Sequence, residues 1–324
     1  MQILVGDIGG TKTALGMARL QGDRVEIEAL SLYPSAEYDS LDAIVRQYLS
    51  ERGAAVSVAA FAIAGPVRGR QSQATNLPWA LDADVLERAL GLADVELLND
   101  LEAVAWGLAA LAPDDWVELH AGEATPGNAC VVAAGTGLGE AGLYWDGVRH
   151  HPFATEGGHA DFAPTDALEC ALLDFLMARF GRVSWERVVS GQGIRNLYDF
   201  LAEWRGGVAP DEVRAAIANG DAAAAIAAGA AAGCALCGET MALFFRLYGR
   251  EAGNMALKQM ALGGVYLGGG IAPKNLDALS RSDFLTRFFD KGRLEPLMRA
   301  MPVRVIVQSQ TPLLGAARYL AARA

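Results

Sequence analysis

The stretch LVGDIGGTKTALG, residues 4–16, decides the fold. It opens with an apolar run, turns at Gly9 and Gly10, and continues as a second run of small and apolar residues. We expect a strand over residues 2–6, a glycine turn, and a second strand that ends at a hairpin turn in QGD, residues 21–23. The dinucleotide-binding fingerprint and the P-loop both need a helix directly after their glycines, so the stretch matches neither motif.

A second unit of the same kind lies further along the chain. ACVVAAGTGLGEAGL, residues 129–143, is again an apolar strand, a glycine turn and a small-residue strand. Two such units, each opening an alternation of strands and helices, indicate an internal duplication of one phosphate-binding hairpin. Because 324 residues fit about two domains, the sequence predicts an α/β protein with parallel pairing and two lobes that face each other across a cleft.

The rest of the chain follows the same alternation. Apolar runs predict strands at residues 57–63, 95–98 and 303–307, and helical periodicity predicts helices at 40–52, 82–90, 185–201 with an interruption at SGQG, 211–260 and 312–323.

Composition and charge exclude several classes of protein. The formal net charge of -11 disfavours nucleic acid as a partner, because an acidic chain repels phosphate backbones. The first residues, MQILVGDIGG, contain no basic leader, and the Ala- and Gly-rich segment between Asp221 and Glu239 is too short and too weakly apolar for a membrane span. The four cysteines are too scattered for a disulfide framework, and Cys234 and Cys237 indicate packing rather than zinc or redox chemistry. We therefore expect a cytoplasmic protein without a membrane or nucleic-acid partner.

Three glycine clusters follow apolar strands: GDIGGTK, AAGTGLG and LGGGIAPK. Successive glycine N–H groups can form an anion-binding concavity, although each cluster alone is equally compatible with a tight turn. Together the three clusters predict a nucleotide cradle. In it, Asp7 would hold Mg²⁺ or its waters, and Thr11 and Thr136 would donate hydroxyls to phosphate oxygens.

A second set of polar residues favours a polyol. In LLNDLEAVAWGL, residues 97–108, an amide and a carboxylate stand between a strand and a helix, where either residue could also serve only as a helix cap. His159 alone is compatible with a core or loop histidine, and Glu186 alone with a solvated helix residue. As a set, the following residues offer the many directed hydrogen bonds that a sugar needs: Asn99, Asp100, Glu156, His159 and Glu186.

Seven motifs in order carry a resemblance: GDIGGTK at 6–12, GPV and TNLPW at 65–79, LLNDLEA at 97–103, GTGLG at 135–139, EGGHADFAP at 156–164, ERVVSG at 186–191 and GGIAPK at 269–274. The chain resembles the bacterial glucokinase family of the hexokinase, heat-shock protein and actin-like superfamily. The resemblance implies a duplicated, two-lobed actin-like ATPase (ribonuclease-H-like) fold with the active site in the interlobe cleft. It implies a small lobe of residues 1–110 plus 301–324, a large lobe of residues 111–300, and a terminal helix that packs back on the small lobe.

The resemblance also implies ATP- and Mg²⁺-dependent phosphorylation of D-glucose at the 6-hydroxyl by a homodimer, with Asp100 as the general base. The implied sugar-binding residues are Asn76, Asn99, Gly137, Glu156, His159 and Glu186. The implied nucleotide-binding residues are Asp7, Gly9, Gly10, Thr11, Lys12, Gly135, Thr136, Gly269 and Gly270.

Two alternatives stay open at this point. The substrate could be another hexose or an N-acetylhexosamine. Separately, the phosphoryl donor could be ADP or polyphosphate in place of ATP. The chain could also be a non-catalytic sugar-binding regulator of the same fold, although such regulators usually carry a helix-turn-helix before the first strand, which here begins at residue 2. Only Cys170 lies near EGGH, so we expect no structural zinc. Glu140 directly after GTGLG is unexpected, because its charge would be unfavourable near phosphates unless it points away or touches the metal.

Overall fold

The computed structural model describes residues 2–21, 24–74, 77–123 and 125–323. The chain divides into two compact units. The first contains Met1–Trp116, His151–Ala154 and Gln308–Ala324, and the second contains Val117–His150 and Thr155–Val307. Two predictions lie outside the described residues, namely the centre of the QGD turn, at positions 22 and 23, and the sugar-binding role of Asn76.

The first unit is built on a five-stranded sheet in the order β3-β2-β1-β4-β8. Strand β1 pairs antiparallel with β2 and parallel with β4, which in turn pairs parallel with β8. The predicted strand, glycine turn and strand are therefore confirmed. The strands are β1 (Gln2–Ile8), β2 (Lys12–Gln21), β3 (Arg24–Pro34), β4 (Val58–Ile63) and β8 (Asp94–Asn99).

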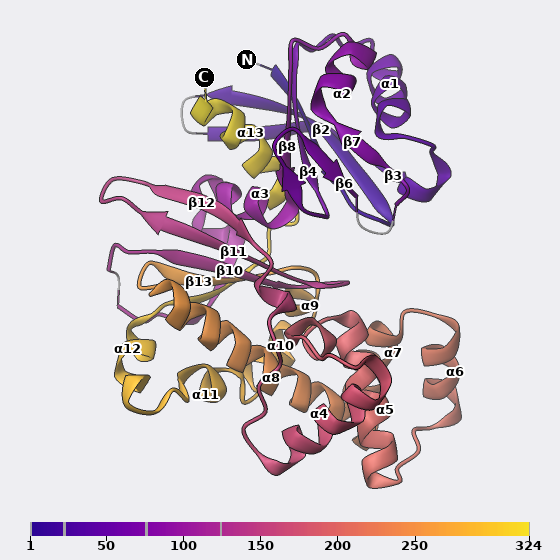
Figure 1. Cartoon of the computed structure of the whole chain (residues 1–324), viewed down its shortest axis with the longest axis vertical. Helices are drawn as coiled ribbons and strands as arrows, with labels where there is room; N and C mark the ends of the chain where they lie inside the picture. Colours follow the sequence, from indigo (N-terminus) through magenta and orange to yellow (C-terminus); the bar gives the residue numbers. More distant parts are fainter. Residues whose placement is uncertain (1, 22–23, 75–76, 124, 324) are drawn as a thin grey trace. The chain divides into compact units, whose positions relative to one another are not determined.

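Both faces of this sheet are covered by helices (Figure 1). Leu4 of β1 packs with α1 and α2 on one face, and Ile3 and Val5 pack with α3 and α13 on the other, as the two-residue repeat of a strand requires. The packing of the terminal helix on this unit confirms the prediction. The helices are α1 (Leu41–Arg52), α2 (Ala83–Leu90), α3 (Asp100–Gly107) and α13 (Thr311–Arg323).

Local signals set the helix ends in this unit. The Ser40 hydroxyl caps α1 by accepting the N–H of Ala43 at 3.4 Å, and Gly53 ends the helix with a φ of 56°. Helices α3 and α13 approach closely, because Gly107 and Gly315 carry no Cβ that would overlap the neighbouring backbone. The remaining elements are η1 (Ser35–Glu37), β5 (Val67–Arg68), β6 (Gln71–Gln73), β7 (Ala80–Asp82), η2 (Leu108–Ala110) and η3 (Pro113–Asp115).

The second unit repeats the same pattern in a six-stranded sheet of order β12-β11-β10-β13-β14-β9. Strand β10 pairs antiparallel with β11 and parallel with β13, which pairs parallel with β14. These pairings repeat those of the first sheet, so the predicted duplication is confirmed. The strands are β9 (Trp116–His120), β10 (Ala129–Ala134), β11 (Leu138–Trp145), β12 (His150–Thr155), β13 (Gly264–Gly268) and β14 (Val303–Ile306).

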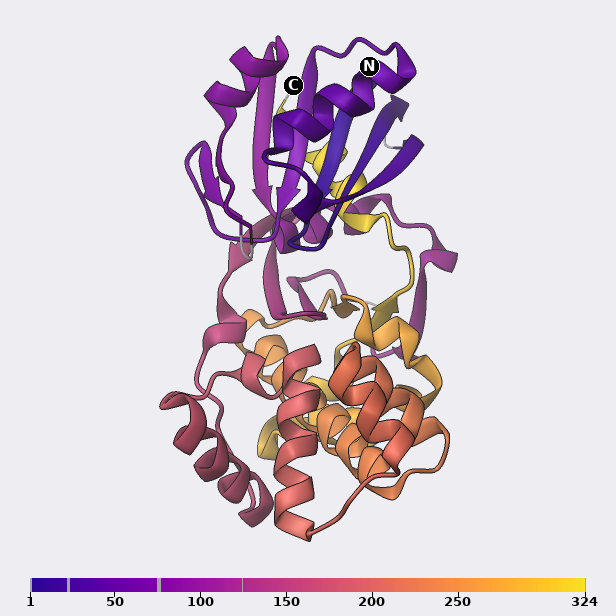
Figure 2. The same cartoon turned by 90° about the vertical axis from the view of Figure 1, so that its right-hand side faces the viewer.

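Helices gather beside this second sheet (Figure 2), and the long α8 is mostly buried. Tyr248 of α8 donates its hydroxyl to the carbonyl of Val132 in β10 at 2.8 Å, which ties helix to sheet. The helices are α4 (Ala167–Phe180), α5 (Gly191–Arg205), α6 (Asp211–Asn219), α7 (Ala222–Ala231), α8 (Ala235–Gln259), α9 (Ile271–Lys274), α10 (Leu276–Ser280), α11 (Phe284–Phe289) and α12 (Glu295–Ala300), with single turns η4 (Gly157–His159), η5 (Trp185–Arg187) and η6 (Gly292–Leu294).

Three details of the predicted helices were wrong. The helix expected over residues 211–260 is divided into α6, α7 and α8, because the chain leaves the helical conformation at Gly220 and again at Gly233 and Cys234. The helix expected from Trp185 begins only at Gly191, because the Ser190 hydroxyl caps it by accepting the N–H of Gly193, so the glycines of SGQG start the helix rather than interrupt it. Cys234 is the N-cap residue of α8 rather than a residue within the helix. Among the described residues, no single helix is long and apolar enough to cross a membrane, and α7 with α8 meets that test only as a pair bent by 112°.

Candidate functional site

The turn between β1 and β2 is fixed by hydrogen bonds to a buried residue, Ser35. Within the turn, the Gly9 N–H donates to the carbonyl of Lys12 at 3.0 Å. Ser35 follows β3, and its hydroxyl donates to the carbonyl of Gly9 at 2.8 Å and lies 3.0 Å from the hydroxyl of Thr13. The Ser35 N–H donates to the carbonyl of Thr11 at 3.1 Å, so one residue fixes three points of the turn. This leaves the side chains of Thr11 and Lys12 exposed.

Asp7 is the carboxylate of this turn. It lies near the end of β1, where its neighbour in β4 is Ala62. Burial raises the pKa of Asp7 to about 6, and the positive charge of Lys12 lowers it only in part. Asp7 is half-buried, and a partly desolvated carboxylate without a full countercharge favours a cation, so Asp7 fits the role of a Mg²⁺ or water-bridged ligand. No group of three or more His, Cys, Asp or Glu side chains in the described ranges forms a metal site of its own.

Asn99 and Asp100 stand at the end of β8, on the same sheet. Asn99 is the N-cap of α3, and its Oδ1 accepts the N–H groups of Leu101 at 3.0 Å and Glu102 at 3.2 Å. Its Nδ2 donates to the carbonyl of Gly65 at 3.2 Å, in the loop after β4. Asp100 is the first residue of α3, and its Oδ1 also accepts the N–H of Leu101 at 3.0 Å. The amide therefore carries the cap, and the carboxylate occupies the positive end of the helix, which stabilises negative charge.

The second glycine turn, between β10 and β11, is fixed by two residues of the ERVVSG motif. The Gly135 N–H donates to the carbonyl of Gly137 at 2.9 Å, and the Gly191 N–H donates to the carbonyl of Gly135 at 2.8 Å. Oε2 of Glu186 accepts the N–H of Leu138 at 2.9 Å, and a Cβ at Gly137 would overlap the same carboxylate. Glu186 thus contacts the backbone of the turn directly, while the Thr136 side chain is exposed.

The third glycine cluster lies beside this second turn. Strands β10 and β13 are parallel, and Ala133 is the register partner of Gly268. Gly269 follows with a φ of 75°, and a Cβ there would overlap the carbonyl of Ala134. Glycine is therefore required for both its conformation and its close approach. The structure brings Gly135, Thr136, Gly269 and Gly270 together at one edge of the second sheet.

Glu156 and His159 are presented by the single turn η4, and both side chains are exposed. The His159 N–H donates to the carbonyl of Glu156 at 3.0 Å. Gly158 lies so close to β11 that a Cβ would overlap the carbonyl of Leu138. Leu138 therefore contacts both Gly158 of η4 and Glu186, so the turn that carries Glu156 and His159 lies beside the strand residue that Glu186 binds.

Several residues that shape these turns could not be found from the sequence. Ser35 and Thr13 hold the first turn and Ser190 starts the helix behind the second, but each looks like an ordinary polar residue at its place in the sequence. Their roles come from strand pairing, which joins residues that are distant along the chain. The predicted residues themselves fall into two groups, Asp7, Gly9, Gly10, Thr11, Lys12, Asn99 and Asp100 in the first unit, and Gly135, Thr136, Gly137, Glu156, His159, Glu186, Gly269 and Gly270 in the second.

Comparison with known proteins adds independent evidence. The family model of Glucokinase matches residues 4–323. The chain is 42% identical over 323 residues to the glucokinase of Marinobacter nauticus, which covers 98% of this chain and 96% of that protein.

Solved structures agree. A glucokinase from an Antarctic psychrotroph has a TM-score of 0.84 and 32% identity, covering 99% of each chain. A glucokinase of the ROK family from Streptomyces griseus, solved in complex with glucose and AMPPNP, has a TM-score of 0.67 and 20% identity, covering 100% of each chain. The predicted duplicated, two-lobed actin-like ATPase fold is confirmed by these likenesses.

Proposed function

This chain belongs to the glucokinase family, and we propose that it transfers the γ-phosphoryl group of ATP to the 6-hydroxyl of D-glucose with Asp100 as the general base. The observation that carries this assignment is that Asn99 is the N-cap of α3 and Asp100 is the first residue of the helix. Asn99 accepts the N–H groups of Leu101 and Glu102, while Oδ1 of Asp100 accepts the N–H of Leu101. Since the amide already caps the helix, a carboxylate in the next position supports a role in the reaction in addition to its contact with the helix.

The reaction requires positioning and charge neutralisation more than covalent chemistry. As the glucose oxygen bonds to the γ-phosphorus, the bond from that phosphorus to the β-phosphate oxygen breaks and ADP leaves. The hydroxyl proton passes to the Asp100 carboxylate, whose negative charge before transfer is stabilised by the helix N-terminus. Asn99 helps to orient this carboxylate, because its Oδ1 accepts N–H groups of the first turn of α3 while its Nδ2 donates to the carbonyl of Gly65.

The remaining roles follow the chemistry of each group. We assign the sugar hydroxyls to Asn99, Glu156, His159 and Glu186, with Gly137 beside them and Asn76 as a further contact. The phosphates are assigned to the two hairpin turns through Gly9, Gly10, Thr11, Lys12, Gly135 and Thr136, and the adenosine to Gly269 and Gly270. The exposed hydroxyls of Thr11 and Thr136 support this, because each is available to a phosphate oxygen.

We assign Mg²⁺ to Asp7, directly or through water. The ion would bridge phosphate oxygens and neutralise their charge when bound. Mg²⁺ usually takes one or two protein carboxylates and completes its shell with water and substrate phosphates, which agrees with a single half-buried carboxylate at the first turn.

Three broader assignments complete the proposal. Residues 1–110 plus 301–324 are assigned to the small lobe and residues 111–300 to the large lobe, whereas the main edges of the compact units are at Trp116 and Gln308. We assign the enzyme to the cytoplasm, where ATP is available. We also assign it as a homodimer, and analytical ultracentrifugation would measure the mass of the assembly.

The test is ADP release from Mg-ATP with a panel of glucose, mannose, fructose and N-acetylglucosamine. Wild type is compared with Asp100→Asn and with Asp277→Asn, a control that removes an exposed carboxylate in α10. We expect glucose to give the fastest turnover, and Asp100→Asn to lower kcat by about 10² to 10⁴ while glucose still binds by calorimetry.

Two results would count against the proposal. If no hexose stimulates ADP release, the chain is not a hexose kinase. If Asp100→Asn turns over glucose as fast as wild type and the Asp277→Asn control, the carboxylate is not the base. Faster turnover of another hexose than of glucose would correct the assigned substrate and leave the rest of the proposal unchanged.

A further inference from the structure

Glu140, the unexpected acid after GTGLG, lies directly under the turn that presents Glu156 and His159. Its side chain is 1% exposed. A Cβ at Gly157, the first residue of η4, would overlap Oε2 of Glu140. The carboxyl group therefore supports the backbone of η4 from the inside of the second unit.

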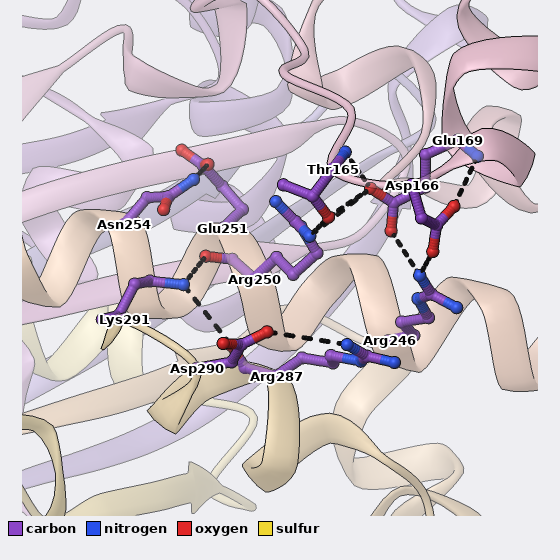
Figure 3. A network of polar contacts seen from close by, with 10 residues as sticks. All are labelled: Thr165, Asp166, Glu169, Arg246, Arg250, Glu251, Asn254, Arg287, Asp290 and Lys291. Atoms are coloured by element: carbon purple, nitrogen blue, oxygen red, sulfur yellow. Dashed lines mark hydrogen bonds and ion pairs between the residues drawn. The ribbon is translucent and has the colours of Figure 1, made fainter. Parts of the chain in front are cut away.

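Glu140 is paired with a second buried acid. Glu251 of α8 is 0% exposed, and its Oε2 accepts a hydrogen bond from Nδ2 of Asn254 at 2.9 Å (Figure 3). Within the described ranges, no N–H or other donor reaches Oε1 of Glu251 or either carboxyl oxygen of Glu140. The only hydrogen that can join the two groups is a carboxyl proton.

The buried cations nearby are engaged elsewhere (Figure 3). Arg250 lies 3.4 Å from Glu169, and Lys291 donates to the carbonyls of Arg250 and Arg287, each at 3.4 Å. Two carboxylates without a direct cation cannot both ionise in a buried place, so the pair holds one proton. Burial, the charge of Glu251 and a hydrogen bond between the two acids raise the pKa of Glu140 to about 8, and burial also raises the pKa of Glu251.

The backbone ties this pair to the turn above it. The Thr155 hydroxyl donates to the carbonyl of Glu140 at 3.0 Å and accepts the N–H of Gly157 at 3.3 Å. Glycines at 157 and 158 let η4 lie flat against β11, so a change at Glu140 is transmitted directly to η4.

We propose that Glu140 is a positioning residue for glucose, and that the single proton it shares with Glu251 keeps the Glu156–His159 turn in its binding position. This inference rests on the proposed role of Glu156 and His159 in sugar binding. When the proton leaves, the carboxylates of Glu140 and Glu251 are both negative and repel each other next to Gly157, so the Glu156–His159 turn moves out of its binding position. Glucose binding weakens, whereas the chemical step at saturating glucose is unchanged.

The sign of the pH dependence follows from the groups that face the pair. Lys258 of α8 and Lys291 favour ionisation of the acids, while Cys130 of β10 and Tyr248 of α8 interact with Glu140 and stay neutral because burial raises the pKa of both. The protonated pair is therefore present at pH 7 and is lost as the pH rises through about 8. As the proton is lost, the fraction of enzyme with the turn in its binding position falls, so the KM for glucose rises with pH.

The experiment measures kcat and the KM for glucose from pH 6.5 to 9.5. Wild type is compared with Glu140→Gln and Glu251→Gln, which keep the side-chain volume and allow an amide to donate to the remaining carboxylate. Glu212→Gln, on the exposed side of α6, is the matched control. We expect the KM of wild type and the control to rise severalfold by pH 9, and the KM of both pair variants to stay within about twofold.

A merely structural role would lower activity and stability equally at every pH and would leave the shape of the KM profile unchanged. That result, or a flat wild-type profile, overturns the inference. Glu156→Gln at pH 7 separates the two levels: if it leaves the KM for glucose unchanged, the assigned sugar site fails and this inference fails with it. If it raises KM while Glu140→Gln keeps the wild-type pH profile, only the inference fails.

Discussion

Replacing Asp7 by Asn should stabilise the protein while it removes activity. Asp7 is half-buried near the end of β1, and desolvation raises its pKa from an ordinary value of 3.8 to about 6, because Lys12 offsets only part of that effect. Keeping such a group ionised at pH 7.5 costs about 3 kcal/mol relative to the unfolded chain. An amide of the same shape does not carry that cost.

The sign and the pH window follow from linkage. A raised carboxyl pKa means that the folded protein binds the proton more tightly than the unfolded chain. The cost is therefore absent below pH 3.8 and complete above about pH 6. By the linkage relation, Asp7→Asn should gain about 1 kcal/mol at pH 4.5 and about 3 kcal/mol at pH 7.5, both as upper limits.

Urea unfolding at the two pH values, without nucleotide and with a chelator, measures this difference, and ADP release measures activity. Asp277→Asn is the control and should change the free energy of unfolding equally at both pH values. A variant that is less stable than wild type at pH 7.5, or whose gain does not grow between the two pH values, would refute the reasoning. Full activity without Asp7 would refute its assignment to the metal and phosphates.

Two further predictions concern the glycine turns. Gly269→Ala should lower the free energy of unfolding by more than about 2 kcal/mol and raise the KM for ATP, because its Cβ would overlap the carbonyl of Ala134. The control is Gly206→Ala, which should lower the free energy of unfolding by only about 1 kcal/mol, because Gly206 has a φ of 64° but open space around it. Equal effects in chemical denaturation would contradict the overlap. Ser35→Ala should cost about 1 to 2 kcal/mol and raise the KM for ATP several-fold, whereas Thr13→Val, which removes only one of its contacts, should do less. An unchanged KM in Ser35→Ala would show that the first turn holds its shape without the serine.

The sequence alone predicts the strands and glycine turns of the two sheets, but not the side chains that hold these turns in place. The strands around Gly9 and Gly135 were predictable because apolar runs and glycine turns are local signals. The contact of Ser35 with Gly9 depends on how β3 returns beside β2, and the contact of Glu186 with Leu138 joins residues 48 positions apart. No local pattern encodes such contacts, since they exist only when the sheet has formed.

The question at Asn99 and Asp100 shows where local reasoning ends. Both residue types are good helix caps, so the sequence could not assign the cap to one of them. The structure assigns it by backbone conformation, because Asn99 is still extended, with a φ of -62° and a ψ of 144°, and Asp100 is already helical. One residue of difference in where β8 ends decides which side chain serves the helix.

The duplicated hairpins differ at the position of Asp7, the carboxylate that we assign to the metal. Asp7 pairs with Ala14 one step before the closing pair of the first hairpin, Ile8 and Thr13. At the equivalent step of the second hairpin, Ala133 pairs with Gly139. The backbone N–H groups that we assign to the phosphates are thus present in both hairpins, but only the first hairpin has a carboxylate at this step. A second carboxylate at this step would add another cost of about 3 kcal/mol and a further negative charge, which one divalent cation would have to offset in addition to the phosphates.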